Sequence, residues 1–161
     1  MKLKKAIYAG SFDPFTVGHL DIVQRALHIF DEVTLVIAVS PSKKPFMTKE
    51  ERENVLNEYF SDEPRVKIAC WDGLIIDYAK NNDISSIVRG LRPTGDFEIE
   101  FQMASVNRRL SPELETVFFM TGENLYYISS SIVKEVFSHG GDISKFVPAE
   151  VLKVLESKRS K

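Results

Sequence analysis

A single α/β domain built on a parallel sheet is predicted for this chain by three observations. Five short apolar runs of strand length are spaced along the 161 residues. A segment with helical periodicity follows each run, and turn residues separate the two. Such alternation is typical of βαβ units with right-handed crossovers and helices on both faces of the sheet. The predicted architecture is a Rossmann-like five-stranded parallel sheet, with residues 1–161 as one domain.

The first strand is expected over residues 3–9, which end in an apolar run closed by Gly10. Asp13 and Pro14 mark a turn, and we expect Thr16 to cap a helix. That helix has an apolar face whose residues recur at intervals of three and four, namely Leu20, Val23, Leu27 and Phe30.

With Thr16 as the cap, His19 occupies the third helical position. An acidic side chain normally suits that position, because the helix N-terminus presents positive potential. A histidine there is explained if an anion binds between its ring and the free N–H groups, which predicts a phosphate site. The alternative is that His19 is a surface residue, which is the commoner role of a lone histidine in a first turn.

The middle of the chain contains two more strand and helix pairs. The second strand is expected over residues 33–39, and a helix with a capping box at Thr48 and Glu51 follows it. The third strand is expected over residues 66–70. The helix after it has an apolar face formed by Leu74, Ile75, Tyr78 and Ala79.

The fourth strand, residues 86–88, precedes a long helix that we expect to run from a Thr94 cap to Leu110. Two apolar faces are expected on this helix, so that one core contact would not cover both and a subunit interface could use the second. The fifth strand is expected over residues 116–120. Two further helices follow, one after residues 129–131 and one opened by Pro148.

Polar groups follow every predicted strand. They are residues 11–19 after the first, Lys43 after the second, Gly73 and Leu74 after the third, Arg89 and Arg92 after the fourth, and Thr121 onward after the fifth. Ligands of open parallel sheets bind beyond the carboxyl ends of the strands, so these groups predict an anion pocket at one rim. Ser129 to Ser131 either cap the following helix or direct hydroxyl and amide groups at a phosphate.

Composition limits the class of protein. The apolar share is 43% and the charged share 27%, and no apolar run is long enough to span a membrane. A net charge of −2 gives no overall attraction for nucleic acid. The single cysteine, Cys70, forms no internal disulfide, and no Cys/His metal cluster is present in the sequence. We expect a cytoplasmic protein.

Several motifs together carry a resemblance that covers essentially the whole chain. They lie at residues 8–14, 16–19, 40–45, 89–92, 96–98 and 128–136, and they read YAGSFDP, TVGH, SPSKKP, RGLR, DFE and ISSSIVKEV. The sequence resembles bacterial phosphopantetheine adenylyltransferases of the nucleotidylyltransferase superfamily. The resemblance implies one nucleotidylyltransferase domain that transfers the adenylyl group of ATP to 4′-phosphopantetheine. The products would be dephospho-coenzyme A and pyrophosphate, with magnesium as cofactor and a homohexamer as the assembly.

The resemblance also implies roles for individual residues. His19 would stabilise the transition state. The acceptor would contact Ser11, Lys43, Leu74, Ile75 and Arg89. ATP would contact Ser11, Phe12, His19, Gly90, Leu91, Arg92, Glu100, Leu125, Tyr126, Tyr127, Ile128, Ser129, Ser130 and Ser131. Residues 122–127 depart from the family pattern, and no protein ligand of magnesium is assigned.

The residues also support this chemistry without the resemblance. A phosphate acceptor is already nucleophilic, so no Ser-His-Asp arrangement is required. The main alternative is a regulatory module that binds adenine nucleotides without turnover, and another nucleotidylyltransferase is the alternative among enzymes. A dinucleotide oxidoreductase is disfavoured, because Gly10 and Gly18 do not form a G-x-G-x-x-G fingerprint.

Overall fold

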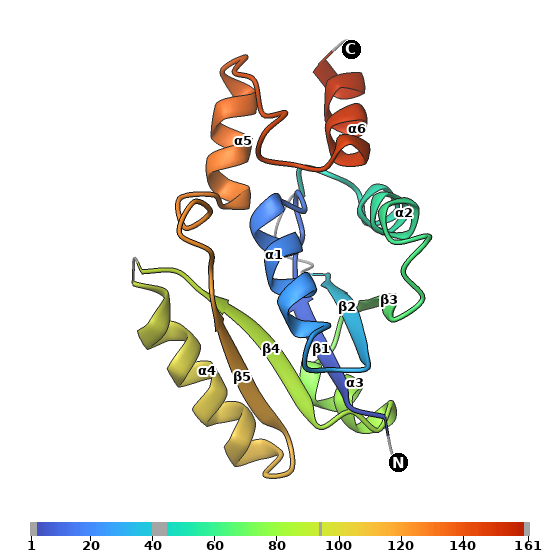
Figure 1. Cartoon of the computed structure of the whole chain (residues 1–161), viewed down its shortest axis with the longest axis vertical. Coiled ribbons are helices and arrows are strands. Elements are labelled where there is room, and N and C mark those ends of the chain that lie inside the picture. Colours follow the sequence, from blue (N-terminus) through green and yellow to red (C-terminus); the bar gives the residue numbers. More distant parts are fainter. Residues whose placement is uncertain (1–2, 40–44, 94, 160–161) are drawn as a thin grey trace.

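A computed structural model of the chain describes residues 3–39, 45–93 and 95–159. Five parallel strands form one sheet, as the sequence predicts, and their order is β3-β2-β1-β4-β5 (Figure 1). The strands are β1 Lys5–Gly10, β2 Glu32–Ala38, β3 Val66–Trp71, β4 Ser86–Leu91 and β5 Glu115–Met120. The helices are α1 Val17–Ala26, α2 Lys49–Tyr59, α3 Ile75–Asn81, α4 Asp96–Leu110, α5 Ser130–Ser138 and α6 Ala149–Arg159.

Both faces of the sheet bury apolar side chains, because alternate strand residues point to opposite faces. On one face, Tyr8 and Leu35 belong to a large core with residues of α1, α2, α5 and α6. On the other face, Ile7 and Val36 belong to a smaller core with Ile76 and Ala79 of α3. Figure 1 shows α5 and α6 beyond the carboxyl ends of the strands, where they close one rim of the sheet.

The N-terminal caps follow the sequence signals at α1 and α2. Thr16 and Thr48 each form a capping box with the residue three positions later. The predicted cap of α4, Thr94, lies outside the described residues. The residue that precedes α4 is Gly95, with a φ of 75° and no side-chain cap hydrogen bond.

The first helix is shorter than its apolar pattern predicts. It ends at Ala26, and Phe30 lies in the segment before β2. The carbonyl of Ala26 accepts from the N–H groups of both Ile29 and Phe30, which tightens the chain into a turn. Phe30 is nevertheless buried in the large core. Phe30 therefore continues the apolar spacing of α1, although it packs on this core from beyond the end of the helix.

The prediction that α4 packs one apolar face on the core is wrong. The structure describes every residue of α4, and none is buried. Ile99 is 66% exposed and Phe101 is 57% exposed, although they belong to the two different predicted faces. Within one chain, α4 lies beside β4 and β5 (Figure 1). Its large apolar side chains are exposed to solvent. Among the described residues, no helix has both the length and the apolar character needed to span a membrane.

Candidate active site

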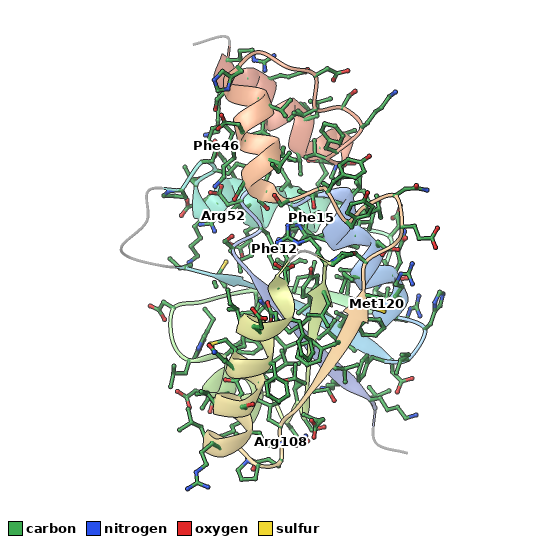
Figure 2. The ribbon with its side chains drawn as sticks, turned by 90° about the vertical axis from the view of Figure 1, so that its left-hand side faces the viewer. Phe12, Phe15, Phe46, Arg52, Arg108 and Met120 are labelled. Atoms are coloured by element: carbon green, nitrogen blue, oxygen red, sulfur yellow. The ribbon has the colours of Figure 1, made fainter. Side chains whose placement is uncertain are left out.

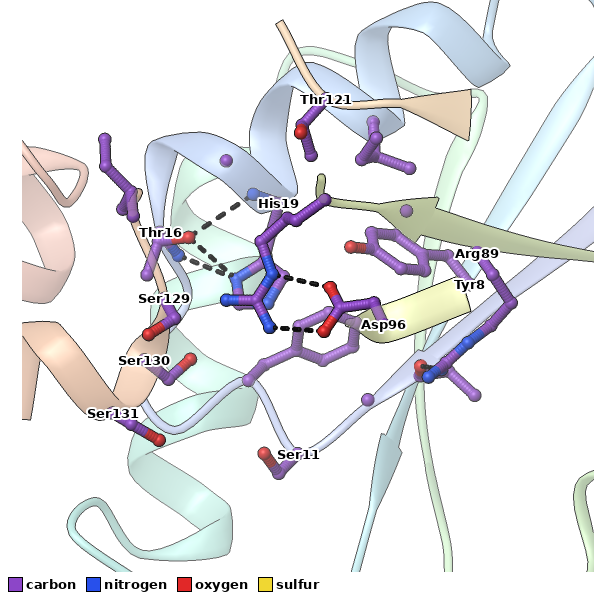
Figure 3. A pocket seen from close by; sticks show the side chains of 18 of the residues that line it. Tyr8, Ser11, Thr16, His19, Arg89, Asp96, Thr121, Ser129, Ser130 and Ser131 are labelled. Carbon is purple, nitrogen blue, oxygen red and sulfur yellow. Dashed lines mark hydrogen bonds and ion pairs between the residues drawn. The ribbon is translucent and has the colours of Figure 1, made fainter. Parts of the chain in front are cut away.

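A cavity of about 330 Å³ opens at the carboxyl end of β1 and β4. Two helix N-termini meet there, because the caps of α1 and α5, Thr16 and Ser129, both line it (Figure 3). Arg89 and Arg92 line it from the end of β4. Two helix N-termini and two guanidinium groups form a pocket suited to a polyanion.

The ring of His19 is held by the cap of its own helix. The main-chain N–H of Thr16 donates to Nδ1 of His19 over 3.0 Å, and the N–H of His19 donates to Oγ1 of Thr16 over 3.3 Å. His19 thus completes the capping box that an acidic residue usually completes. Because Nδ1 accepts a hydrogen bond, the proton of the neutral ring is on Nε2, which remains a donor.

Aromatic rings surround the imidazole of His19. Phe15 stacks on it at 5.4 Å between ring centroids, and Phe12 meets it edge-on at 5.2 Å. Burial lowers the pKa of His19 to about 4, and the positive charges of Arg92 and Arg89 act in the same direction. The ring is therefore neutral at physiological pH and suited to donate a hydrogen bond rather than to carry charge.

Arg89 is fixed by two elements. Its guanidinium donates to both carboxylate oxygens of Glu100 on α4, over 2.7 and 2.5 Å, and to the carbonyl of Ala9 over 2.7 Å. Burial by itself lowers the pKa of Arg89, but the hydrogen bonds and charge of Glu100 outweigh that effect and the pKa is raised. Arg89 remains charged and keeps one orientation at the base of the cavity.

Arg92 forms a similar ion pair with Asp96, the first residue of α4. The two hydrogen bonds are 2.7 and 3.1 Å long. Both arginines of the cavity therefore have carboxylate partners.

The three serines at the N-terminus of α5 have different functions in the fold. Oγ of Ser129 accepts from the N–H of Ile132, so Ser129 is the helix cap. The hydroxyl of Ser130 donates to the carbonyl of Pro14 over 2.8 Å, which ties α5 to the loop after β1. Ser131 is exposed at the cavity wall. Capping thus explains Ser129, and all three serines line the cavity.

Gly90 allows close packing at the cavity floor. A Cβ at this position would lie 3.1 Å from Cγ1 of Ile22 on α1 and 3.9 Å from the hydroxyl of Tyr8. Glycine therefore permits α1 to approach β4 closely. Tyr8 also lines the cavity, and burial raises the pKa of its phenol, which stays protonated as a neutral group.

A second, smaller cavity of about 120 Å³ lies on the α4 side of the sheet. It shares Ala9, Arg89 and Glu100 with the first cavity. Its remaining lining is mainly apolar, with one amide, and consists of Ile75, Ile87, Met103, Ala104, Asn107 and Thr116. Arg89 and Glu100 thus stand between a polar cavity and an apolar one.

Comparison with known proteins agrees with this geometry. Residues 7–136 match a family model described as cytidylyltransferase-like. A curated phosphopantetheine adenylyltransferase of Anaeromyxobacter sp. (strain K) is 46% identical over 155 residues, which cover 96% of this chain and 94% of the relative. The chain belongs to the phosphopantetheine adenylyltransferase family.

Two further members of the phosphopantetheine adenylyltransferase family support the assignment. The protein of Desulfosudis oleivorans is 49% identical over 156 residues, which cover 97% of this chain and 93% of that protein. The protein of Caldanaerobacter subterraneus is 45% identical over 159 residues, which cover 99% of each.

The adenylyltransferase pocket collects most of the residues predicted from the sequence. The larger cavity is lined by Ser11, Phe12, His19, Arg89, Gly90, Arg92, Glu100, Ile128, Ser129, Ser130 and Ser131. Ile75 lines the smaller cavity, whereas Leu74 caps α3 and is 60% exposed beside it. Lys43 lies outside the described residues.

Some predicted nucleotide contacts lie away from both cavities. The carbonyl of Leu91 accepts from Thr121, and Leu91 lines neither cavity. Leu125 packs against the large core, while Tyr126 and Tyr127 are exposed on the loop before α5. In this structure these four residues do not contribute to the pocket walls.

Other lining residues were missed by the sequence analysis, although one signal pointed to them. Asp96 and Asn107 were missed, but they lie at helical spacing with the predicted residue Glu100 on α4, where all three interrupt the apolar faces. Polar residues at this spacing share one side of a helix. That side of α4 faces the cavities. Thr16 and Thr121 belong to the segments after strands 1 and 5 that were predicted to form the rim, whereas Tyr8 carried no comparable signal.

Proposed function

We propose that this chain transfers the adenylyl group of ATP to 4′-phosphopantetheine, giving dephospho-coenzyme A and pyrophosphate. The observation that carries the proposal is the junction of two unlike cavities at Arg89. The polar cavity suits the triphosphate of ATP. The apolar cavity suits the pantetheine arm, and the Asn107 amide suits one of the amide groups of that arm. The acceptor phosphate then lies near Arg89.

The reaction requires little of the protein besides positioning and charge stabilisation. An oxygen of the acceptor phosphate attacks the α-phosphorus of ATP, and the bond from that phosphorus to the bridging oxygen breaks as pyrophosphate leaves. The attacking phosphate is already ionised, so no general base is needed. Holding the two substrates in line provides much of the rate, and fixed donors stabilise the developing charge.

His19 is the proposed transition-state donor. Its ring is neutral, its tautomer is fixed by Thr16, and Nε2–H is the donor that the cap leaves available. Arg92 and the N-terminus of α5 add positive potential from the other walls. Lys43 is proposed to bind the acceptor phosphate, and Ser11 to contact both substrates.

We propose that magnesium enters the site already bound to the phosphates of ATP. The cavity carboxylates Asp96 and Glu100 are paired with arginines. Among residues 3–39, 45–93 and 95–159, no group of three or more His, Cys, Asp or Glu side chains is placed to hold a metal. Octahedral magnesium commonly keeps several waters and uses substrate phosphates as ligands, which fits this donor set. Bound there, it would neutralise phosphate charge.

We propose a cytoplasmic location, because ATP is the donor substrate. The proposed assembly is a homohexamer. The apolar side chains of α4 support oligomerisation, since many large exposed apolar residues on one helix are typical of a protein interface. Its residues are Phe97, Ile99, Phe101, Met103, Val106 and Leu110, all more than half exposed.

Product analysis tests the proposal. The chain is incubated with ATP, magnesium and 4′-phosphopantetheine, and dephospho-coenzyme A is measured by mass spectrometry. Omission of each substrate in turn is the control. Formation of dephospho-coenzyme A only in the complete mixture supports the proposal. Binding of ATP without any product would favour a regulatory module that binds adenine nucleotides instead.

A further inference from the structure

Two charged side chains are buried beside the active site without a role in the proposed chemistry. Asp13 is 6% exposed and Arg52 is 4% exposed. Burial of a charge is costly unless hydrogen bonds compensate it. The partners that compensate Asp13 and Arg52 therefore indicate why these charges are present.

Asp13 belongs to the loop after β1, but its hydrogen bonds go to the segment before α2. Its two carboxylate oxygens accept from the N–H groups of Phe46 and Met47, over 2.8 and 2.7 Å. Lys134 of α5 lies 3.8 Å from the same carboxylate.

Arg52 makes the opposite connection. It belongs to α2, and its guanidinium donates to the carbonyl of Ser11 over 2.8 Å and to that of Thr48 over 3.3 Å. A side chain of each segment thus holds the main chain of the other. Figure 2 shows Arg52, Phe46 and Phe12 gathered where α2 meets the loop after β1.

The residue between these two attachment points has an unfavourable backbone conformation. Phe12 has a φ of 46°, in the left-handed region that side chains other than glycine seldom adopt. Such conformations persist only where surrounding contacts over-determine them, and they gather at functional sites. Arg52 holds the residue before Phe12, and Asp13 is the residue after it.

We propose that Asp13 and Arg52 form a reciprocal clamp that positions Ser11 in the polar cavity, so that both are positioning residues for adenylyl transfer. The proposal rests on the proposed function, in which the Ser11 hydroxyl contacts both substrates. Neither Asp13 nor Arg52 lines either cavity, so the clamp acts through the main chain of residues 11–13. A displacement of about 1 Å in a positioning group can cost about 100-fold in rate.

Arg52→Met removes the donors and keeps most of the side-chain volume. We expect kcat to fall about 10- to 100-fold at a temperature well below the melting point. Arg65→Met is the control, because Arg65 also donates to a distant carbonyl, that of Leu27 over 3.3 Å, but directly precedes β3, at the end of the sheet opposite the larger cavity. We expect the control to stay within about twofold of wild type, as is usual for an exposed site.

A double-mutant cycle separates positioning from general destabilisation. If the clamp acts through Ser11, Arg52→Met should cost less than about threefold in kcat when Ser11→Ala is already present. Additive losses in kcat, or full activity of Arg52→Met, would overturn the proposal. Should Arg52→Met fail to fold, Arg52→Lys and Asp13→Asn replace it in the same cycle, because each keeps part of the hydrogen bonding.

The same variants are titrated with ATP by calorimetry. If wild type forms no dephospho-coenzyme A, the proposed function fails, and non-additive weakening of ATP binding by Arg52→Met and Ser11→Ala still supports the clamp. Unchanged or additive ATP affinities would then reject the clamp as well.

Discussion

The main-chain N–H of Thr16 lies 3.0 Å from Nδ1 of His19, and this contact sets the tautomer of the histidine. Sequence reasoning placed His19 in the third helical position but left its protonation state open. The structure assigns the proton to Nε2, because Nδ1 accepts. Burial, with two nearby arginines, keeps the ring neutral. His19 is thus both a helix-cap partner and a candidate donor to phosphate.

The pKa of His19, about 4, predicts a specific pH dependence. An unfolded histidine has a pKa near 6.5, so between about pH 6.5 and 4 the unfolded chain binds a proton that the folded chain does not. The contribution of neutral His19 to the free energy of unfolding should be fully present above about pH 6.5 and should decrease as the pH falls from there to about 4. NMR titration of the His19 ring checks the assignment. A His19 titration near pH 6.5 would contradict it.

Substitution of His19 tests its two roles separately. His19→Ala should lower turnover by about 10²–10³-fold, the usual cost of losing one preorganised donor. It should also destabilise the fold by about 1 kcal/mol, because the capping box is lost. His19→Gln should preserve the melting temperature, since glutamine completes a capping box, and still lose turnover. Turnover within a few-fold of wild type for both variants would mean that His19 is structural only.

Lys43→Ala is expected to separate the two substrates. The ammonium group is predicted to make a charge-assisted contact with the acceptor phosphate, so KM for 4′-phosphopantetheine should rise more than Kd for ATP. Steady-state kinetics with each substrate varied, together with calorimetry for ATP, measures the difference. Equal loss of affinity for both substrates would contradict the assignment.

The exposed face of α4 predicts oligomerisation. Light scattering at micromolar concentration should give the mass of a homohexamer for wild type. Phe101→Glu places a charge on α4 and should reduce that mass. Ile29→Glu is the matched control, because Ile29 is similarly exposed but lies after α1. A monomeric wild type would refute the prediction.

The sequence predicted the sheet well because each strand is a short apolar run closed by turn residues. Helix ends were less predictable. Phe30 continues the apolar spacing of α1 but lies beyond the end of that helix and packs on the core. Periodicity alone does not distinguish a helical residue from a loop residue that packs on the same core. The sequence predicted that one apolar face of α4 could serve a subunit interface, but not that both faces are exposed, because apolar spacing does not say whether the covering surface belongs to the same chain.

The candidate site followed from strand ends, which gather at one rim in any parallel sheet. The ion pairs within the site could not be predicted from the strand ends. Arg89 pairs with Glu100 across a strand and a helix, which only the packing of α4 decides. The sequence analysis assigned no role to Arg52, and its guanidinium is buried, with hydrogen bonds to two carbonyls. Contacts of this kind depend on tertiary structure and leave no periodic signal.

The most direct test of the account is pyrophosphate release from ATP and magnesium, measured with and without 4′-phosphopantetheine at pH 7.5. The account predicts release by wild type that depends on the acceptor, with dephospho-coenzyme A formed in equal amount. It also predicts that His19→Gln, folded to the same melting temperature, releases pyrophosphate about 10²–10³-fold more slowly. No acceptor-dependent release by wild type, or an equal rate for His19→Gln, would contradict it.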